Sequence, residues 1–220
     1  AHDDGFVATG TPNQGNTDNL PTGAGPRLMW IPAKAAFRVG AATDNKWDID
    51  NVGDLSVSLG GGTMASGASA VALGFGTTAS GTFATAAGYN TTASGTNSTA
   101  LGNLVNTNNQ SGSFAIGDYT GGSVLNSTAE NQFSARFAGG YRLFSNSGMS
   151  QGLVLSADNR VRLGTTIIGP RAGLDVAHPD GIVATGTLGS GNTANLPTGT
   201  GTRLMWIPAK AAFRVGHASE

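Results

Sequence analysis

Between residues 55 and 117, apolar and polar positions alternate in short runs that recur every 14 residues. The runs end on Leu59-Gly60, Leu73-Gly74, Ala87-Gly88 and Leu101-Gly102, and one extra residue precedes Ile116-Gly117. Alternation over four or five residues predicts a short strand with one buried face, and the glycine that closes each run allows a sharp corner. Because so short a unit cannot bury its apolar face alone, we expect the repeats to stack into a solenoid with Leu or Ala above its equivalent.

A second, longer repeat encloses these runs. Residues 1 to 40 recur as residues 177 to 216, and 32 of the 40 positions are identical. Both copies contain the apolar sequence Leu-Met-Trp-Ile-Pro-Ala-Lys-Ala-Ala-Phe-Arg-Val-Gly. A module that occurs twice around a different segment indicates a piece of a longer mosaic array.

The rest of the chain also favours β structure. We expect strands at Arg27 to Ile31 and Ala35 to Val39, separated by Pro32, which marks a turn or an edge. Two hairpins are predicted, one from Phe133 to Phe144 around Gly139-Gly140 and one from Leu153 to Leu163 around Asp158-Asn159. The predicted modules are 1–54 (first Trp-Ile-Pro copy and linker), 55–117 (repeat region), 118–176 (hairpin-rich module) and 177–220 (second copy).

The repeat from Ala72-Leu73-Gly74 through Ser80-Gly81 resembles the head repeat of trimeric autotransporter adhesins of the YadA type. That resemblance implies an all-β, left-handed parallel β-roll that assembles as an intertwined homotrimer, with Val71 and Leu73 facing inward. The flanking Trp-Ile-Pro modules and the Phe133 to Phe144 segment are similar to parts of mosaic bacterial and phage fibres. This second likeness implies β-hairpin or β-prism-like flanking modules.

Composition and charge exclude several functions. The chain has 12 basic and 13 acidic residues and a net charge of −1, which gives no electrostatic footprint for nucleic acid. No run approaches 18 apolar residues, so no membrane insertion is expected. Residues 55–117 contain no Asp, Glu, Lys, Arg or His, and the chain contains no Cys. General acid-base catalysis, thiolate sites and the calcium-binding turns of other rolls are therefore not expected, and we predict no enzyme activity, cofactor or metal.

A few residues outside the roll leave alternatives open. Asp44, Asp48, Asp50 and Asp54 form a cluster that is either a cation site or a set of loop carboxylates, and His2 and His178 are either axial ligands in a trimer or linker residues. Trp30 and Trp206 are predicted to fill a core or an interface, with sugar stacking as the alternative. Trp47 lies in a polar loop and is the better candidate for exposure. The Thr77-Thr78 and Thr91-Thr92 pairs also resemble the threonine columns of ice-binding solenoids.

These observations predict a non-enzymatic, structural and adhesive segment of a trimeric bacterial surface fibre. Its partners would be two further copies of itself and glycans or proteins on host, prey or target cells, and its location would be extracellular. The alternatives are a bacteriophage tail-fibre segment and an ice-binding β-solenoid. Any ligand contact is expected in unrepeated polar loops, and the candidate residues are Asn106, Asn108, Asn109, Tyr119 and Asn126.

Overall fold

The structure is a computed structural model, and it describes residues 8–119, 122–149, 151–157, 161–165, 174–177, 201–207 and 212–218. The chain divides into two compact units, Ala1–Ala138 and Gly139–Glu220, and each unit is described by itself.

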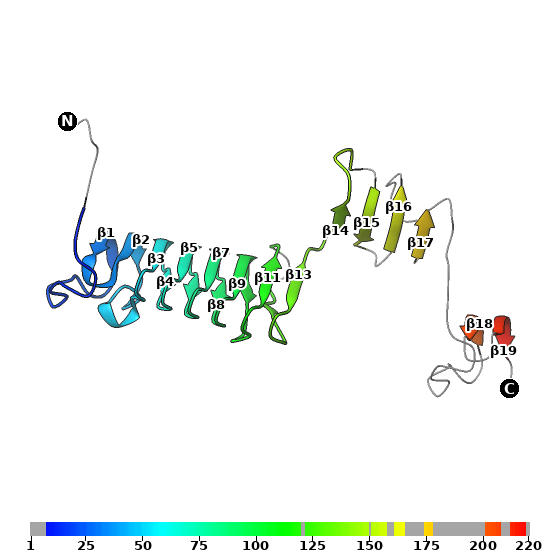
Figure 1. The fold of residues 1–220 in the computed structure, drawn as a ribbon, viewed down its shortest axis with the longest axis horizontal. Helices are drawn as coiled ribbons and strands as arrows, with labels where there is room; N and C mark the ends of the chain where they lie inside the picture. The colour runs from blue at the N-terminus through cyan, green and yellow to red at the C-terminus, as the bar shows by residue number, and fades with distance from the viewer. Residues whose placement is uncertain are drawn as a thin grey trace. The chain divides into compact units, whose positions relative to one another are not determined.

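Two sheets of stacked strands build the first unit, and the strands follow one another along a roll (Figure 1). The larger sheet contains, in hydrogen-bonded order, β1 (Gly25–Ile31), β2 (Ala36–Ala42), β3 (Val57–Gly61), β5 (Val71–Phe75), β7 (Thr85–Tyr89), β9 (Thr99–Asn103), β11 (Phe114–Gly117) and β13 (Phe133–Arg136). The smaller sheet contains β4 (Met64–Ala65), β6 (Thr78–Ala79), β8 (Thr92–Ala93), β10 (Val105–Asn106) and β12 (Leu125–Asn126). Apart from two 3-10 turns, η1 (Pro32–Lys34) and η2 (Ile49–Asn51), the described residues form no helix. The prediction of a nearly all-β fold is thus confirmed for this part of the chain.

The stacking register follows the sequence repeat. Leu59 pairs with Leu73, Leu73 with Ala87 and Ala87 with Leu101, all between parallel strands. Leu101 then pairs with Ile116, so the extra residue is absorbed between these two rungs. The predicted placement of Leu or Ala above its equivalent is confirmed.

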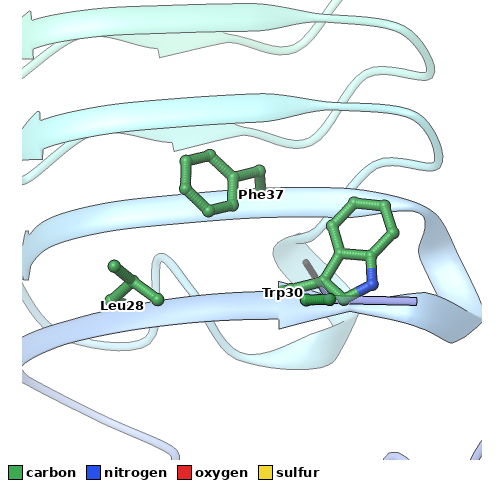
Figure 2. A pocket seen from close by; sticks show the side chains of 4 residues that line it. Leu28, Trp30 and Phe37 are labelled. Atoms are coloured by element: carbon green, nitrogen blue, oxygen red, sulfur yellow. The ribbon is translucent and has the colours of Figure 1, made fainter. Parts of the chain in front are cut away.

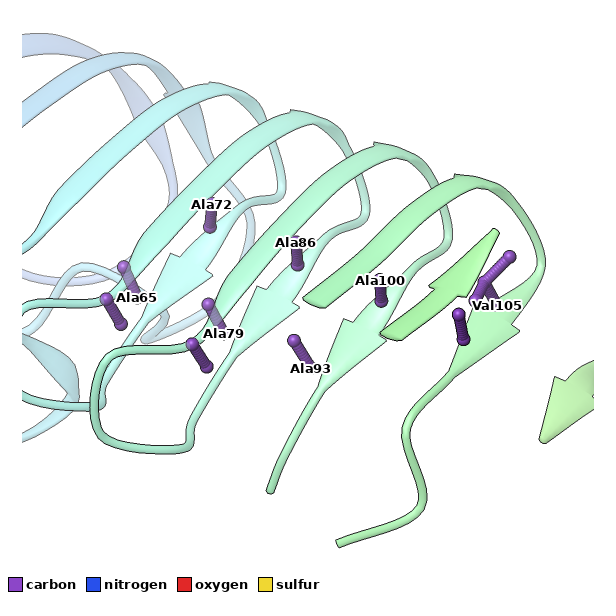
Figure 3. Close-up of a cluster of buried hydrophobic side chains, with 10 residues drawn as sticks. Ala65, Ala72, Ala79, Ala86, Ala93, Ala100 and Val105 are labelled. Carbon is purple, nitrogen blue, oxygen red and sulfur yellow. The ribbon is translucent and has the colours of Figure 1, made fainter. Parts of the chain in front are cut away.

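Alanine side chains fill the inside of the roll (Figure 3). The buried cluster contains Ala65, Ala70, Ala72, Ala79, Ala84, Ala86, Ala93, Ala100, Val105 and Ala115. Because a methyl group occupies so little space, the two sheets approach closely, and each rung contributes little apolar area to its own core. The larger apolar side chains of the same strands, such as Val71 and Leu73, are only half-buried and point out of the roll. The expectation that these two residues face inward is therefore wrong for the single roll, because the alternate position, Ala72, fills its interior.

Threonines line the inner wall of the smaller sheet, and two of their hydroxyls have no partner. In the first rung, the Ser58 hydroxyl donates to the Thr63 hydroxyl at 2.6 Å. The register places Ala72, and then Ala86, where Ser58 stands in the first rung. The buried hydroxyls of Thr77 and Thr91 accordingly lack a hydrogen-bond partner.

We expect Ala72→Ser to stabilise the roll by about 1 kcal/mol, because the new hydroxyl would reproduce the Ser58–Thr63 hydrogen bond for Thr77. The free energy of unfolding in urea measures the change. Ala100→Ser is the matched control, since Val105 stands at the register position of a threonine on that rung. That control should destabilise the roll by burying an unpaired hydroxyl. Equal destabilisation by both variants would contradict the assignment.

The β1–β2 hairpin closes the first end of the roll. It is antiparallel, whereas β2 pairs in parallel with β3 and so continues the larger sheet. A second core lies beneath it and contains Met29, Ile31, Ala36, Ala42, Trp47 and Val52. A solenoid needs such a cap, because its terminal rung would otherwise expose the apolar interior to water.

Arg38 joins this cap to the first rung. Its guanidinium is fully buried and donates to the Ser56 carbonyl at 3.0 Å, the Ser56 hydroxyl at 2.8 Å and the Ala65 carbonyl at 3.0 Å. Burial lowers the pKa of Arg38 to about 10. The side chain therefore ends the alanine core with a hydrogen-bonded polar group and links both sheets to the hairpin.

The second unit contains two smaller sheets. One has the order β14 (Gly140–Phe144), β15 (Gln151–Ser156), β16 (Val161–Thr165) and β17 (Leu174–Ala177), and the other pairs β18 (Gly201–Ile207) with β19 (Ala212–Ala218). The β18–β19 register reproduces that of β1–β2, with Trp206 opposite Phe213 as Trp30 is opposite Phe37. The sequence duplication is therefore a structural one.

Two sequence-based expectations are settled by the strand pairing. The prediction of a hairpin from Phe133 to Phe144 is wrong, because β13 pairs in parallel with β11 while β14 pairs with β15. The antiparallel pairing of Leu153–Leu155 with Val161–Leu163 is confirmed. The larger sheet runs across both predicted limits of the repeat region, residues 55 and 117, since it also includes β2 and β13. The division into four modules stays a prediction.

Candidate interaction surfaces

Ionisable side chains of the described residues meet in ion pairs and not in a metal-binding cluster. No group of three or more His, Asp or Glu side chains in this part of the chain could hold a metal ion. Within the acidic loop, an Asp48 carboxylate oxygen accepts from the Gly23 amide at 2.7 Å, and Asp54 forms an ion pair with Lys34 at 3.3 Å. These contacts favour loop carboxylates over a cation site. His2 and His178 lie outside the described residues.

An apolar face covers the outer side of the larger sheet. Along each strand, one set of residues points into the roll and is largely buried, as Ala72 is. The alternate set points outward and is either half-buried, as Val71 and Leu73 are, or exposed, as Phe75 is. The outward set, which we call the apolar face, contains Leu28, Trp30, Phe37, Val39, Val57, Leu59, Val71, Leu73, Phe75, Ala87, Tyr89, Leu101, Phe114, Ile116 and Phe133. In a single chain nothing described in the structure covers this face.

A hollow of about 320 Å³ lies on the hairpin part of the apolar face (Figure 2). It is lined by Ala8, Leu28, Trp30 and Phe37, and the rings of Trp30 and Phe37 lie beside it. The indole nitrogen of Trp30 is buried and has no hydrogen-bond partner. An unsatisfied indole N–H in an apolar hollow fits packing better than sugar recognition, which uses polar groups beside the ring. The side chain of Trp206 is outside the described residues.

Trp47 is not exposed, so that prediction is wrong. Its side chain is 1% exposed, and its indole nitrogen donates to the Thr63 carbonyl at 2.7 Å. The polar neighbours in the sequence point elsewhere, while the indole fills the cap core beneath the hairpin.

Stacked aromatic pairs on the apolar face were missed by the sequence analysis. Phe75 and Tyr89 stack with ring centroids 5.7 Å apart, and Phe114 and Phe133 stack at the same distance. All four rings are substantially exposed. The signal was present for the first pair, because Phe75 and Tyr89 both follow the glycine that closes a run. The second pair spans an insertion that hides its register.

The polar candidates fall into two places. Asn106 and Asn126 are paired neighbours on the smaller sheet, and Thr92 pairs with Asn106 on its other side. Asn108 and Asn109 form the next turn, where both have positive φ angles of 50° and 59°. The Asn106 side-chain oxygen accepts from the Asn108 amide at 2.7 Å, and the Asn109 amide donates to the Ser94 hydroxyl at 2.8 Å. Much of this asparagine content therefore builds the turn itself.

Tyr119 is the most exposed candidate, at 87%. It follows β11 at the start of the segment that leads to β12 and β13. Arg136 anchors this segment: its guanidinium lies 3.5 Å from an Asp118 carboxylate oxygen and donates to the Asn103 carbonyl at 3.1 Å. The Ala138 amide donates to the second Asp118 oxygen at 2.7 Å. The exposed Tyr119 side chain thus lies next to a backbone segment that hydrogen bonds hold in place.

The threonine columns do not form an ice-binding surface. Thr78 pairs with Thr92 on the outside of the smaller sheet, but Thr77 and Thr91 are fully buried inside the roll. These two rungs therefore each present one threonine outward rather than a two-threonine ledge, and Met64 and Asn106 take the equivalent positions on the neighbouring rungs. The ice-binding alternative is not supported.

The first unit is thus a repeat-built scaffold, in which stacked strands carry an apolar outer face and loops but no catalytic cluster among the described residues. Residues 52–77 and 79–104 match the YadA head domain repeat in two copies. The repeat region therefore carries YadA head repeats, and the resemblance found in the sequence is confirmed. No curated protein and no solved structure matches the chain.

The family of this repeat defines a coarse functional class. YadA-like adhesins are surface-exposed homotrimers that bind host surface ligands, and the head is not known as an enzyme. Among the described residues, no helix has the length and hydropathy that crossing a membrane requires.

Proposed function

We propose that this chain is a segment of a trimeric bacterial surface fibre in which three rolls pack through their apolar faces. The carrying observation is the leucine column on the outside of an alanine-filled roll. Leu59, Leu73 and Leu101 are half-buried in one chain, so that burying the rest of each side chain stabilises an assembly by about half of the roughly 1.5 to 3 kcal/mol that full burial of an exposed leucine gives. Repeated over several rungs and three chains, this gain exceeds the cost of association.

Each protomer of the proposed trimer would be a left-handed roll, and the trimer would display its loops away from the cell. Three copies of each loop on one rigid scaffold would combine weak contacts through their effective concentration. Partners would be glycans or proteins on a cell surface. The hollow at Trp30 supports this arrangement, because a neighbouring roll seated on the apolar face would fill it.

We further propose that ligand contact comes from the loops around Asn106, Asn108, Asn109, Tyr119 and Asn126. Tyr119 and Asn126 are the best probes, because both are exposed and neither forms the asparagine turn. A Tyr119→Ser, Asn126→Ser double variant should keep its fold and its assembly while binding to a glycan array falls at least about tenfold, as expected where an aromatic anchor is lost.

The control for this experiment is Thr96→Ala, an exposed residue of a turn outside both loops. Light scattering of the unmodified chain tests the assembly separately. A folded monomer of 22.0 kDa at micromolar concentration would contradict the trimer. Unchanged glycan binding by a folded, trimeric double variant would contradict the loop assignment alone.

A further inference from the structure

Each rung of the roll enters the larger sheet through a corner residue with a left-handed backbone. The φ angles are 58° at Leu55, 54° at Ser69, 57° at Phe83, 56° at Asn97 and 66° at Gly112. The amides of these residues make equivalent hydrogen bonds to the preceding rung: Ser69 donates to the Asp54 carbonyl at 2.7 Å, Phe83 to Ala68 at 2.8 Å and Asn97 to Thr82 at 2.9 Å. The corner backbone is therefore the same whichever side chain stands on it.

Two of these corners carry side chains that the conformation disfavours. The left-handed region suits Gly and Asn, whereas Leu and Phe are rare there because their Cβ and ring crowd the backbone. Asn97 and Gly112 show that the roll accepts the favoured residues at this position. The backbone conformation of the corner is therefore less favourable with Leu55 or Phe83 than with the Asn or Gly of other rungs.

Both side chains are mostly exposed within their own chain. Phe83 is 60% exposed and Leu55 is 63% exposed. Each position therefore has two costs, an unfavourable backbone conformation and an exposed apolar side chain. An asparagine at that position would remove both. A contact outside the single chain would offset them.

We propose that Phe83 and Leu55 are contacts between protomers, each packing against a second copy of this chain at the edge of the apolar face. The strand places them there: Phe83, Thr85, Ala87 and Tyr89 alternate with the buried Ala84 and Ala86, so that Phe83 begins the outward row of its rung. This inference rests on the proposed trimer and extends its interface from the flat sheet to the corner. It names the second copy rather than a ligand, because the corner is continuous with the face that the trimer buries.

The test compares Phe83→Asn in two assembly states. In the otherwise unmodified chain, Phe83→Asn should raise the dissociation constant of the trimer at least tenfold. Analytical ultracentrifugation over a dilution series measures this constant. In a Leu73→Asp background, where the chain is expected to be monomeric, the same change should raise the midpoint of thermal unfolding, because asparagine relieves the corner. Weaker assembly together with a more stable monomer identifies an interprotomer contact. If Phe83 only shaped the corner, the substitution would change the stability of the trimer and of the monomer in the same direction.

Ser69→Asn is the matched control, since it changes the same corner one rung away without removing an apolar side chain. It should leave assembly within a factor of two. A Phe83→Asn trimer that dissociates like the unmodified trimer would overturn this inference and leave the proposed trimer intact. If that trimer instead lost only its binding to a glycan array, the corner would belong to a ligand site, which also overturns it. A monomeric unmodified chain would overturn the proposed function and this inference together.

Discussion

Leu73→Asp is expected to convert the assembled protein into a folded monomer. In a single roll the Leu73 side chain points outward and is half-buried, while Ala72 fills the interior, so that an aspartate at position 73 stays hydrated and the roll keeps its core. In a trimer, three carboxylates would be buried against apolar neighbours, and each one costs several kcal/mol, or at least about 3. Assembly should weaken by about six orders of magnitude, since the three carboxylates together cost about 9 kcal/mol and each 1.4 kcal/mol is about tenfold.

Size-exclusion chromatography with light scattering measures this change directly. The unmodified chain should elute at three times its mass of 22.0 kDa and the variant at that mass, with the same far-ultraviolet circular dichroism spectrum. Thr78→Asp is the control, because Thr78 is also half-buried and outward-facing but lies on the smaller sheet. An assembled Leu73→Asp protein would show that the leucine column is not the interface.

The roll was predictable from sequence because one period determines both the strands and their register. The same 14-residue spacing sets the alternation within a strand and the register between strands, so that Leu73 meets Leu59 and Ala87 without any long-range information. The alternation also separates the alanines from the leucines, but it did not show that Ala72 fills the interior of the roll while Val71 and Leu73 point outward. What it could not show is how each end of the stack is closed.

The errors arose where the period ends. Phe133 joins the sheet beside Phe114 after an insertion, so the 14-residue spacing did not predict this pairing. The glycines after Phe137 suggested a hairpin instead. Trp47 was read from its polar neighbours, but the unfilled end of the solenoid decides its position. The role of Asn106, Asn108 and Asn109 in ligand contact stays a prediction, but the sequence did not show that they also build a tight turn with two positive φ angles.

Gly88→Ala is expected to break the roll, and the reason lies in how closely the rungs stack. Gly88 has a φ angle of +127°, which side chains other than glycine rarely adopt. A Cβ atom at this position would lie 1.9 Å from the Gly102 carbonyl oxygen and 2.8 Å from its carbon. Because both contacts are with the backbone of the next rung, only a separation of β7 from β9 could relieve them.

That separation removes the ladder hydrogen bonds on which the stack depends, since each rung of a solenoid is held mainly by its neighbours. We expect a loss of more than about 3 kcal/mol in the free energy of unfolding, which is in the range of severe single substitutions. Urea denaturation followed by circular dichroism measures it, and performing it in the Leu73→Asp background separates unfolding from dissociation.

Gly61→Ala is the matched control for this substitution, because it lies on the same sheet and differs in what surrounds it. Its φ angle is not in the left-handed region, and the added Cβ would meet only the side chain of Phe75, at 2.9 Å. That ring is exposed and can turn aside, so the control should cost less than about 1 kcal/mol, as surface substitutions usually do. If the two variants unfolded at the same urea concentration, the close backbone approach at the glycine column would not be what holds the rungs in register.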